Sequence, residues 1–283
     1  MATIIDGKAI ATEIKAELAE KVKIFKAEYN ITPTLAVIIV GEDPASQVYV
    51  RNKEKACNDT GFDSIVLPMP EDVSEQTLLT TIEGLNYCPD IHGILVQLPL
   101  PKHLNEEKIL LAIDPKKDVD AFHPYNVGKL MQGNPTFLPC TPAGVMELLK
   151  RYDIDVAGKE CIIVGRSNIV GKPLSMLMLQ ANGTVTICHS KTKDLKEVCK
   201  RADILVAAIG KPKFFDASYI KEGAVVIDVG ITRDENGKLC GDIDFEAVKD
   251  IASYITPTPG GTGPMTIAML MQNTFKAAEE LVK

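Results

Sequence analysis

The amino-terminal segment places apolar residues four positions apart, with charged residues between them. Ile10, Ile14, Leu18 and Val22 follow this spacing, which puts them on one face of an α-helix. Asp6 precedes the pattern, and a short carboxylate there can accept hydrogen bonds from the first free N–H groups of a helix. We therefore expect an amphipathic helix that begins at Asp6 and packs on a sheet.

The next part of the chain alternates near-continuous apolar runs with helical patterns. Strands are expected at residues 35–40, 64–67 and 93–98, and helices at 44–59 and 74–85. Apolar strands separated by helices are typical of a parallel sheet that is covered on both faces. After the polar stretch 114–120, the segment up to Pro139 is expected to be rich in loops.

The same alternation restarts near residue 140. Thr141-Pro142 favours a helix start with Thr141 as the cap, and this helix is expected to run to about Tyr152. Further strands are expected at 161–164, 184–188, 204–209 and 224–229. A final helix, about 264–282, carries a row of apolar residues that would pack on the first domain: Ile267, Leu270, Met271, Phe275 and Ala278.

The length of 283 residues is enough for two modest domains. The pattern predicts an α/β protein with a first domain over residues 1–140, joined by the C-terminal helix 264–283, and a second domain over 141–263. The second domain has the strand and helix order of a Rossmann-type dinucleotide-binding fold.

Composition and charge exclude several classes of function. A content of 46% hydrophobic and 24% charged residues is that of a globular protein, and the net charge of −7 argues against a nucleic-acid-binding surface. The seven cysteines are scattered with no Cys-x-x-Cys pair, so neither a disulfide framework nor a metal site is indicated. No signal peptide or membrane-spanning apolar run is visible, which favours a cytoplasmic protein.

A glycine-containing turn follows the expected strand 161–164. The segment from Gly165 to Pro173 leads into a helix, whose free N–H groups and positive dipole end suit a pyrophosphate. The spacing departs from Gly-x-Gly-x-x-Gly because Ser167 stands at the second position and Gly171 comes one residue late. By itself the turn fits an ordinary connection with a helix-capping serine equally well.

The end of the next strand changes this balance. Enzymes that use NAD usually carry an acid there, which binds the adenosine ribose. This chain has Ser190 with Lys191 and Lys193 instead. A hydroxyl and cations accept the additional phosphate of NADP, and the guanidinium of Arg166 suits it as well. We therefore predict NADP as the cofactor.

Tyr49 and Lys53 are four residues apart on an expected helix, so their side chains share one face. A lysine in a partly apolar cleft loses solvation of its ammonium, which lowers its pKa and lets it transfer protons near neutral pH. The alternatives are a solvated surface lysine and a tyrosine packed in the core with its hydroxyl in water.

Three other features in the sequence also have two interpretations. Gln97 ends an aliphatic strand, so its amide either finds partners in the interior or faces a ligand cleft. Asp120 belongs to an acidic loop that is equally consistent with a solvated surface. The Pro- and Gly-rich segment 256–264 either brings backbone close to a ligand or simply connects domains.

Taken together, these segments resemble the methylenetetrahydrofolate dehydrogenase/cyclohydrolase family. The resemblance runs in order along nearly the whole chain and rests on seven motifs: Tyr49 to Lys53, Gly93 to Pro101, Lys117 to Asp120, Gly165 to Pro173, His189 to Thr192, Asp228 to Ile231, and Pro259 to Thr266.

The resemblance implies an enzyme of one-carbon metabolism and purine biosynthesis. It would oxidise 5,10-methylenetetrahydrofolate with NADP⁺ and hydrolyse the product to 10-formyltetrahydrofolate. Lys53 would transfer protons, Tyr49 would stack on the folate, Gln97 would position Lys53, and Asp120 would hydrogen-bond the pterin. NADP would contact Gly165, Arg166, Ser167, Ser190 and Ile231. The folate would also contact Leu98, Pro259, Gly260 and Gly263.

The family's fold is two α/β domains flanking a cleft, usually in a homodimer, so a homodimer is expected here too. One position departs from the family, because Ala121 stands where a glycine is usual. If this position needs a positive φ, alanine costs on the order of 1 kcal/mol and displaces Asp120. The rival functions are a dehydrogenase without the hydrolytic step, one that uses NAD, and a non-catalytic NADP-binding sensor.

Overall fold

The computed structural model describes residues 1–282, which form two compact units. The six-strand unit comprises Met1–Ala11 and Pro139–Thr266, and the three-strand unit comprises Thr12–Leu138 and the segment from Ile267 onward. Residues 1–11 thus group with the second half of the chain and not with the first. The reason is that β1 (Thr3–Ile4) pairs in parallel with β11 (Tyr254–Ile255), a contact too short to leave a pattern in the sequence.

The sheet of the six-strand unit is entirely parallel, in the order β6-β5-β7-β8-β11-β1. Its remaining strands are β5 (Glu160–Val164), β6 (Thr184–Cys188), β7 (Ile204–Ala207) and β8 (Val225–Asp228). The chain passes from β5 to β6 on one side and then returns to β7 on the other. The strand order therefore reverses between β5 and β7, and open α/β sheets bind ligands at the carboxyl ends of strands at such a point.

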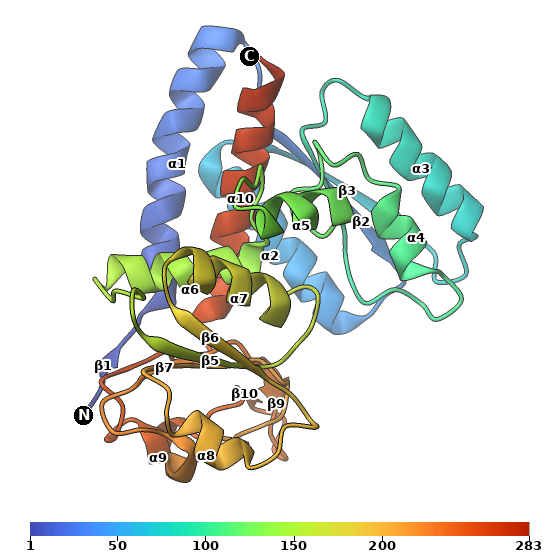
Figure 1. Ribbon diagram of the computed structural model, residues 1–283. Coiled ribbons are helices and arrows are strands. Elements are labelled where there is room, and N and C mark those ends of the chain that lie inside the picture. The colour runs from blue at the N-terminus through green and yellow to red at the C-terminus, as the bar shows by residue number, and fades with distance from the viewer. Residues whose placement is uncertain (283) are drawn as a thin grey trace. The chain divides into compact units, whose positions relative to one another are not determined.

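Helices cover both faces of this sheet, as the continuous burial of β7 and β8 requires. Figure 1 shows α6 and α7 over one face and α8 and α9 over the other. The helices are α6 (Cys140–Arg151), α7 (Gly171–Gln180), α8 (Leu195–Cys199) and α9 (Phe245–Val248), with a 3₁₀ turn at Ala217–Tyr219. A small antiparallel pair, β9 (Thr232–Arg233) and β10 (Leu239–Cys240), follows β8.

The three-strand unit is built on a parallel sheet in the order β3-β2-β4. The strands are β2 (Thr34–Val40), β3 (Asp63–Met69) and β4 (Gly93–Val96). The helices are α1 (Gly7–Tyr29), α2 (Pro44–Thr60), α3 (Glu75–Tyr87), α4 (Glu106–Leu111), α5 (Pro124–Met131) and α10 (Thr262–Leu281), of which α1 and α10 each begin in the six-strand unit. Here too the strand order reverses, between β2 and β4.

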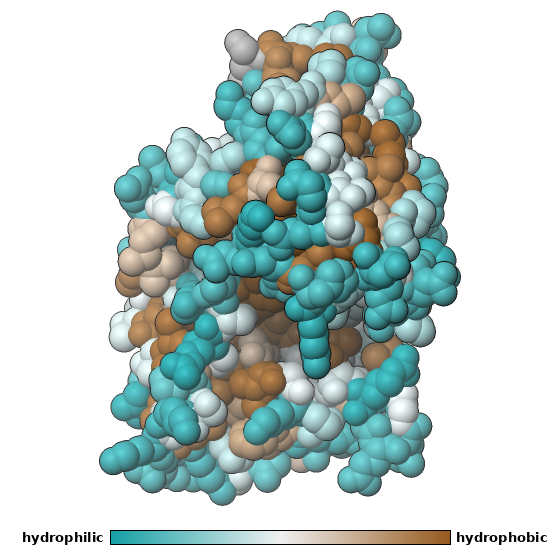
Figure 2. Space-filling model, turned by 90° about the vertical axis from the view of Figure 1, so that its right-hand side faces the viewer, coloured by the Kyte–Doolittle hydropathy of each residue, from teal (hydrophilic) through white to brown (hydrophobic). Residues whose placement is uncertain are grey.

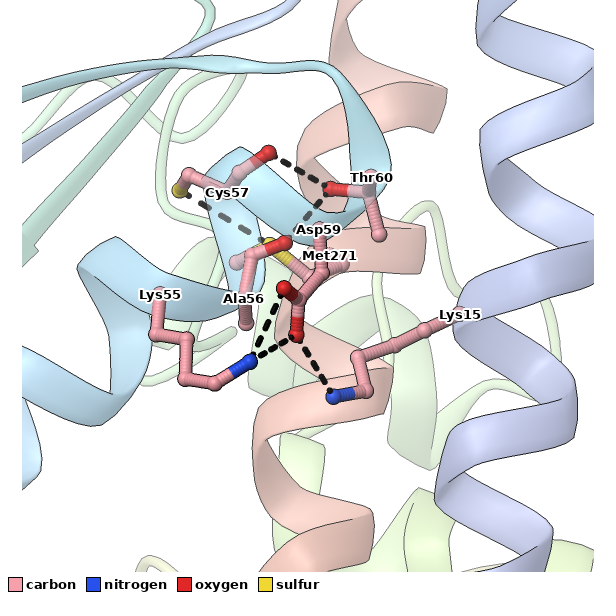
Figure 3. Close-up of polar contacts among 7 residues, drawn as sticks. All are labelled: Lys15, Lys55, Ala56, Cys57, Asp59, Thr60 and Met271. Atoms are coloured by element: carbon pink, nitrogen blue, oxygen red, sulfur yellow. Dashed lines mark hydrogen bonds and ion pairs between the residues drawn. The ribbon is translucent and has the colours of Figure 1, made fainter.

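Helix α2 is held by contacts with two helices that are distant in the sequence (Figure 3). The carboxylate of Asp59 lies 2.8 Å from the Lys55 ammonium on the same helix and 3.4 Å from the Lys15 ammonium on α1. On another side, the Cys57 sulfur lies 3.8 Å from the sulfur of Met271 on α10. These contacts fix the helix that carries Tyr49 and Lys53.

Most expected elements are present, and the differences have local causes. Asp6 does cap α1, since its carboxylate accepts the N–H of Ala9 at 2.9 Å. Thr141 is not a cap: α6 begins one residue earlier, and the Thr141 hydroxyl is hydrogen-bonded to the Thr266 hydroxyl at 2.8 Å. The segment expected to be loop contains α5, which is short and begins at Pro124.

No helix within residues 1–282 combines the length and the apolar character needed to cross a membrane. On the face drawn in Figure 2, hydrophilic side chains cover much of the surface, with hydrophobic patches between them.

Candidate functional site

Lys53 and Gln97 meet at the point where the strand order of the smaller sheet reverses. Lys53 lies on α2, the helix that follows β2, and Gln97 is the first residue after β4. The Lys53 ammonium donates a hydrogen bond of 2.8 Å to the side-chain oxygen of Gln97. Lys53 is only 9% exposed, so it is a buried side chain and not a solvated surface charge.

The amide of Gln97 is itself held in place. Its side-chain nitrogen donates to the carbonyl of Leu98 at 2.7 Å, and its backbone N–H donates to the carbonyl of Ile38 on β2 at 2.8 Å. Because the nitrogen is committed to Leu98, the oxygen faces Lys53. Gln97 is half-buried. Its amide therefore has partners in the interior and also lies at the carboxyl end of a strand, so both interpretations of its sequence position apply.

Tyr49 lies one turn before Lys53 on α2, on the same face. It is 38% exposed, so its ring is open to contact from outside. Partial burial raises the pKa of its hydroxyl above the usual value of 10.0. The sequence predicted the spacing of this pair, whereas the different exposure of its two members comes from the structure.

The acidic segment that ends at Asp120 lies beside β4. Asp118 forms a parallel bridge with Ile94, and its buried carboxylate accepts the backbone N–H of His123 at 2.9 Å. Asp118 thus serves the local fold, while Asp120 is half-buried. The next residue, Ala121, has φ +59° and is 1% exposed. The conformation that makes glycine usual at this position is therefore present here with an alanine.

Asn273 on α10 also holds this segment, and nothing in the sequence pointed to it. Its side-chain nitrogen donates to the carbonyl of Val119 and to that of Leu138, both at 2.8 Å. A buried asparagine within an otherwise apolar helix face is the one signal that could have indicated it.

In the six-strand unit, the turn after β5 has two positions that only glycine fits. A Cβ on Gly165, whose φ is +139°, would lie 2.3 Å from the carbonyl oxygen of Ala208, the residue after β7. A Cβ on Gly171 would lie 2.1 Å from the carbonyl oxygen of Gly165. The late glycine of the motif is thus the first residue of α7, packed directly on the turn. The turn thus brings backbone without side chains to the point where the strand order reverses, between β5 and β7.

The polar side chains of this turn indicate a site for an anionic ligand. The Ser167 hydroxyl accepts the N–H groups of Val170 at 3.1 Å and Gly171 at 3.4 Å, so it caps the start of α7. Arg166 and Ser190 are exposed. Since Val164 on β5 is in register with Cys188 on β6, both residues lie two positions beyond neighbouring strand ends. A guanidinium and a hydroxyl, with no acid among residues 189–193, suit a phosphate more than a free ribose hydroxyl.

The loop 259–263 is tied to two other segments of the same unit. The N–H of Lys8 donates to the carbonyl of Gly260 at 2.9 Å, and the Thr262 hydroxyl donates to the carbonyl of Asp228 at 3.0 Å. A Cβ on Gly263 would lie 3.2 Å from the side chain of Ile231, which is 44% exposed. The structure thus brings Ile231 next to this loop, although they are more than 25 residues apart in the sequence.

Within residues 1–282 no group of three or more His, Cys, Asp or Glu side chains could hold a metal ion.

Comparison with known proteins finds two domain models of one family along the chain. The model for the tetrahydrofolate dehydrogenase/cyclohydrolase catalytic domain matches residues 5–120, and the model for the NAD(P)-binding domain of that family matches residues 139–282. The bifunctional protein FolD of Acetivibrio thermocellus is 62% identical over 98% of this chain and 97% of its own length. That of Streptococcus thermophilus is 57% identical over the full length of both.

Solved structures of bifunctional FolD enzymes have the same fold as this chain. The bifunctional FolD of Campylobacter jejuni is 50% identical, covers 99% of both chains and superposes with a TM-score of 0.97. The FolD of Trypanosoma brucei, solved with NADP cofactor and an inhibitor, is 39% identical and has a TM-score of 0.96, covering 100% of this chain and 99% of its own.

Proposed function

We propose how the two units share the chemistry of this chain, on the premise that it belongs to the tetrahydrofolate dehydrogenase/cyclohydrolase family. As a member of that family it is an NADP-dependent enzyme that oxidises 5,10-methylenetetrahydrofolate to 5,10-methenyltetrahydrofolate and hydrolyses this product to 10-formyltetrahydrofolate. The observation that carries the assignment of residues is the buried contact between Lys53 and Gln97.

Lys53 is the proton-transfer residue of the hydrolytic step. Water adds to the methenyl carbon, which is already electrophilic, so the protein has to remove a proton from the water and deliver one to the departing ring nitrogen. A single buried amine with a fixed orientation can do both in turn. The side-chain oxygen of Gln97 accepts a 2.8 Å hydrogen bond from the amine and holds it in place. Gln97 is therefore a positioning residue.

The remaining residues of the folate site bind and orient the substrate. The exposed ring of Tyr49 offers a stacking surface one turn from Lys53. Asp120 would accept hydrogen bonds from the pterin. Leu98, whose carbonyl accepts the side-chain N–H of Gln97, would contact the folate beside it. The folate would also contact the loop residues Pro259, Gly260 and Gly263. The two glycines have no side chain that could obstruct the ligand.

The cofactor site lies at the turn after β5. When bound, NADP⁺ supplies the hydride acceptor for the oxidation. Gly165 allows the pyrophosphate to approach the backbone at the positive end of the α7 dipole, and the Ser167 hydroxyl, which accepts two N–H groups of the turn, can donate its own proton to it. Arg166 and Ser190 would hold the 2′-phosphate, and Ile231 would pack on the cofactor near the 259–263 loop.

A coupled assay tests the complete proposal. Enzyme, NADP⁺ and 5,10-methylenetetrahydrofolate are mixed, and NADPH and 10-formyltetrahydrofolate are followed in the same reaction. Both products should form. NADPH without the formyl product would identify a monofunctional dehydrogenase, and binding of NADP⁺ without turnover would identify a sensor.

Two further properties belong to the proposal: a homodimeric state, which rests on the family resemblance, and a cytoplasmic location, which the sequence favours. Light scattering at micromolar concentration should give twice the mass of one chain. The mass of a single chain would contradict the homodimer.

A further inference from the structure

A buried carboxylate, Asp242, binds the loop that follows β7. Asp242 is 0% exposed. One of its carboxylate oxygens accepts the N–H groups of Ile209 at 2.6 Å and Gly210 at 3.2 Å, and the other accepts the N–H of Lys211 at 2.7 Å. Three successive backbone donors therefore converge on one side chain, and this fixes the path of the loop.

A second buried carboxylate, Asp228, binds the loop that follows β8. Asp228 is the last residue of that strand and is 2% exposed. It accepts the N–H groups of Gly230 at 2.9 Å, Asp242 at 3.0 Å and Ile243 at 3.0 Å. The Asp228 side chain thus holds both the residue before Ile231 and the segment that carries Asp242.

Two glycines leave the space that these carboxylates occupy. A Cβ on Gly230 would lie 2.3 Å from a carboxylate oxygen of Asp242, and a Cβ on Gly241 would lie 1.8 Å from one of Asp228. Burial raises the pKa of the Asp228 carboxyl to about 7. Placing two carboxylates in the interior is costly, and apolar side chains often stabilise a fold better. What the carboxylates add is a fixed backbone geometry.

That geometry lies at the edge where the cofactor is proposed to bind. Ala207 on β7 is in register with Val164 on β5 and with Asp228 on β8, so the loops starting at Gly165, Ala208 and Val229 leave the sheet side by side. The first is the phosphate-binding turn. The second and third are those held by Asp242 and Asp228.

On the basis of the proposed NADP⁺ site, we propose that Asp242 and Asp228 are positioning residues for the dinucleotide. They hold the loops 209–211 and 229–231 in the conformation that receives NADP⁺ beside the phosphate-binding turn. The two residues act through backbone N–H groups and take no part in the proton transfers of hydrolysis.

The test separates cofactor binding from hydrolysis. In Asp242→Asn one oxygen still accepts a hydrogen bond, while the new amide nitrogen faces a backbone N–H and displaces the loop. A buried backbone N–H left without its acceptor corresponds to a loss of about 10–10²-fold. We expect the Kd and KM for NADP⁺ to rise by about that factor, while hydrolysis of added 5,10-methenyltetrahydrofolate stays within about threefold of wild type.

Asp203→Asn is the matched control. Asp203 directly precedes β7, so it lies at the amino ends of the strands and not at the carboxyl ends where the two loops begin. The Asp203 carboxylate also accepts a backbone N–H, that of Glu160 at 2.9 Å, and pairs with Lys221 at 2.7 Å. This variant should keep the wild-type KM for NADP⁺. An unchanged KM in Asp242→Asn, or an equal loss of both activities there, would overturn the proposal.

Hydrogen exchange on the wild-type enzyme gives a test that needs no variant. Saturating NADP⁺ should slow exchange at the amides of 209–211 and 229–231 and leave the amide of Glu160 unchanged. Saturable binding of NADP⁺ without protection of those two loops would overturn this inference alone. A wild-type enzyme that binds no NADP⁺ would instead refute the proposed function.

Discussion

The two units solve different chemical problems at the same kind of place. Each has a parallel sheet whose strand order reverses at one point, between β2 and β4 in one and between β5 and β7 in the other. In the three-strand unit that point holds buried Lys53, whose amine is bonded to the side-chain oxygen of half-buried Gln97. In the six-strand unit it holds bare glycine backbone with exposed Arg166 and Ser190 nearby.

The difference follows from what each site has to do. Proton transfer needs one titratable group held in a fixed orientation away from bulk water, so a long side chain is buried and bonded. Binding a large anion needs many N–H donors and space for the ligand, so side chains are removed from the turn and cations stay at its rim. Under the proposed function, the same topology supports catalysis by a side chain in one unit and binding by backbone in the other.

The largest expected effect comes from Lys53→Met, which removes the amine and keeps most of the apolar stem. A positioned acid or base typically contributes ~10²–10⁴-fold, so hydrolysis of the methenyl substrate should fall by about that much, and NADPH formation by less. The two activities are measured separately after circular dichroism confirms the fold. Lys55→Met, on the exposed side of the same helix, is the control. Hydrolysis within a few-fold of wild type would leave the proton-transfer residue unassigned.

Arg166→Ala tests the other unit. A hydrogen bond to a charged group contributes about 1.5–3 kcal/mol, so the preference for NADP⁺ over NAD⁺ should fall by roughly 10–10²-fold. The measurement is kcat/KM with both cofactors. Arg201→Ala, which removes an exposed arginine paired with Glu160, should leave that preference intact. A wild-type preference for NAD⁺ would contradict the assignment of Arg166 and Ser190.

Asp59→Asn tests how the helix that carries Lys53 is anchored. The ion pairs of Asp59 with Lys55 and Lys15 are partly exposed, so the free energy of unfolding should fall by only about 0.5–1 kcal/mol at pH 7. Hydrogen bonds from Lys55 and then Lys15 lower the pKa of the Asp59 carboxyl below its usual value of 3.8. The contribution of the Asp59 carboxylate to the free energy of unfolding is therefore present above pH 4 and is lost as the pH falls through the lowered pKa.

Urea unfolding at pH 7 and pH 3 measures this effect. The difference between wild type and Asp59→Asn should shrink at the lower pH. A difference that grows on acidification would show that the charge of Asp59 does not stabilise the folded state.

The smallest expected effect is that of Ala121→Gly. A left-handed conformation costs alanine about 1–2 kcal/mol, while loss of its buried methyl group costs about 0.8 kcal/mol. The variant should therefore be more stable by about 0.5 kcal/mol, the difference between these two effects. Ala277→Gly, at a buried position within α10, should be destabilising instead. A stability loss in both variants would mean that the backbone at Ala121 carries no strain.

Much of the fold follows from patterns that are local in the sequence. The apolar runs predicted β2, β5, β6 and β8 to within a residue or two, because a strand buried on both faces needs consecutive apolar side chains. Tyr49 and Lys53 share a helix face because of their spacing alone. The missing acid after β6 and the glycines around Ser167 indicated an NADP site, since these features depend on residue type at one turn.

Only the tertiary structure decided which distant residues meet. Lys53 reaches Gln97, 44 residues later, because β4 lies beside β2 in the sheet. Residues 3–4 pair with 254–255, and Asp242 reaches the loop at 209–211, through strand neighbours that no local pattern specifies. Periodicity records which face of an element is buried, whereas the partner of that face is set by sheet order and packing. The burial of Lys53 and the positive φ of Ala121 follow from that packing, and the sequence alone could only pose them as alternatives.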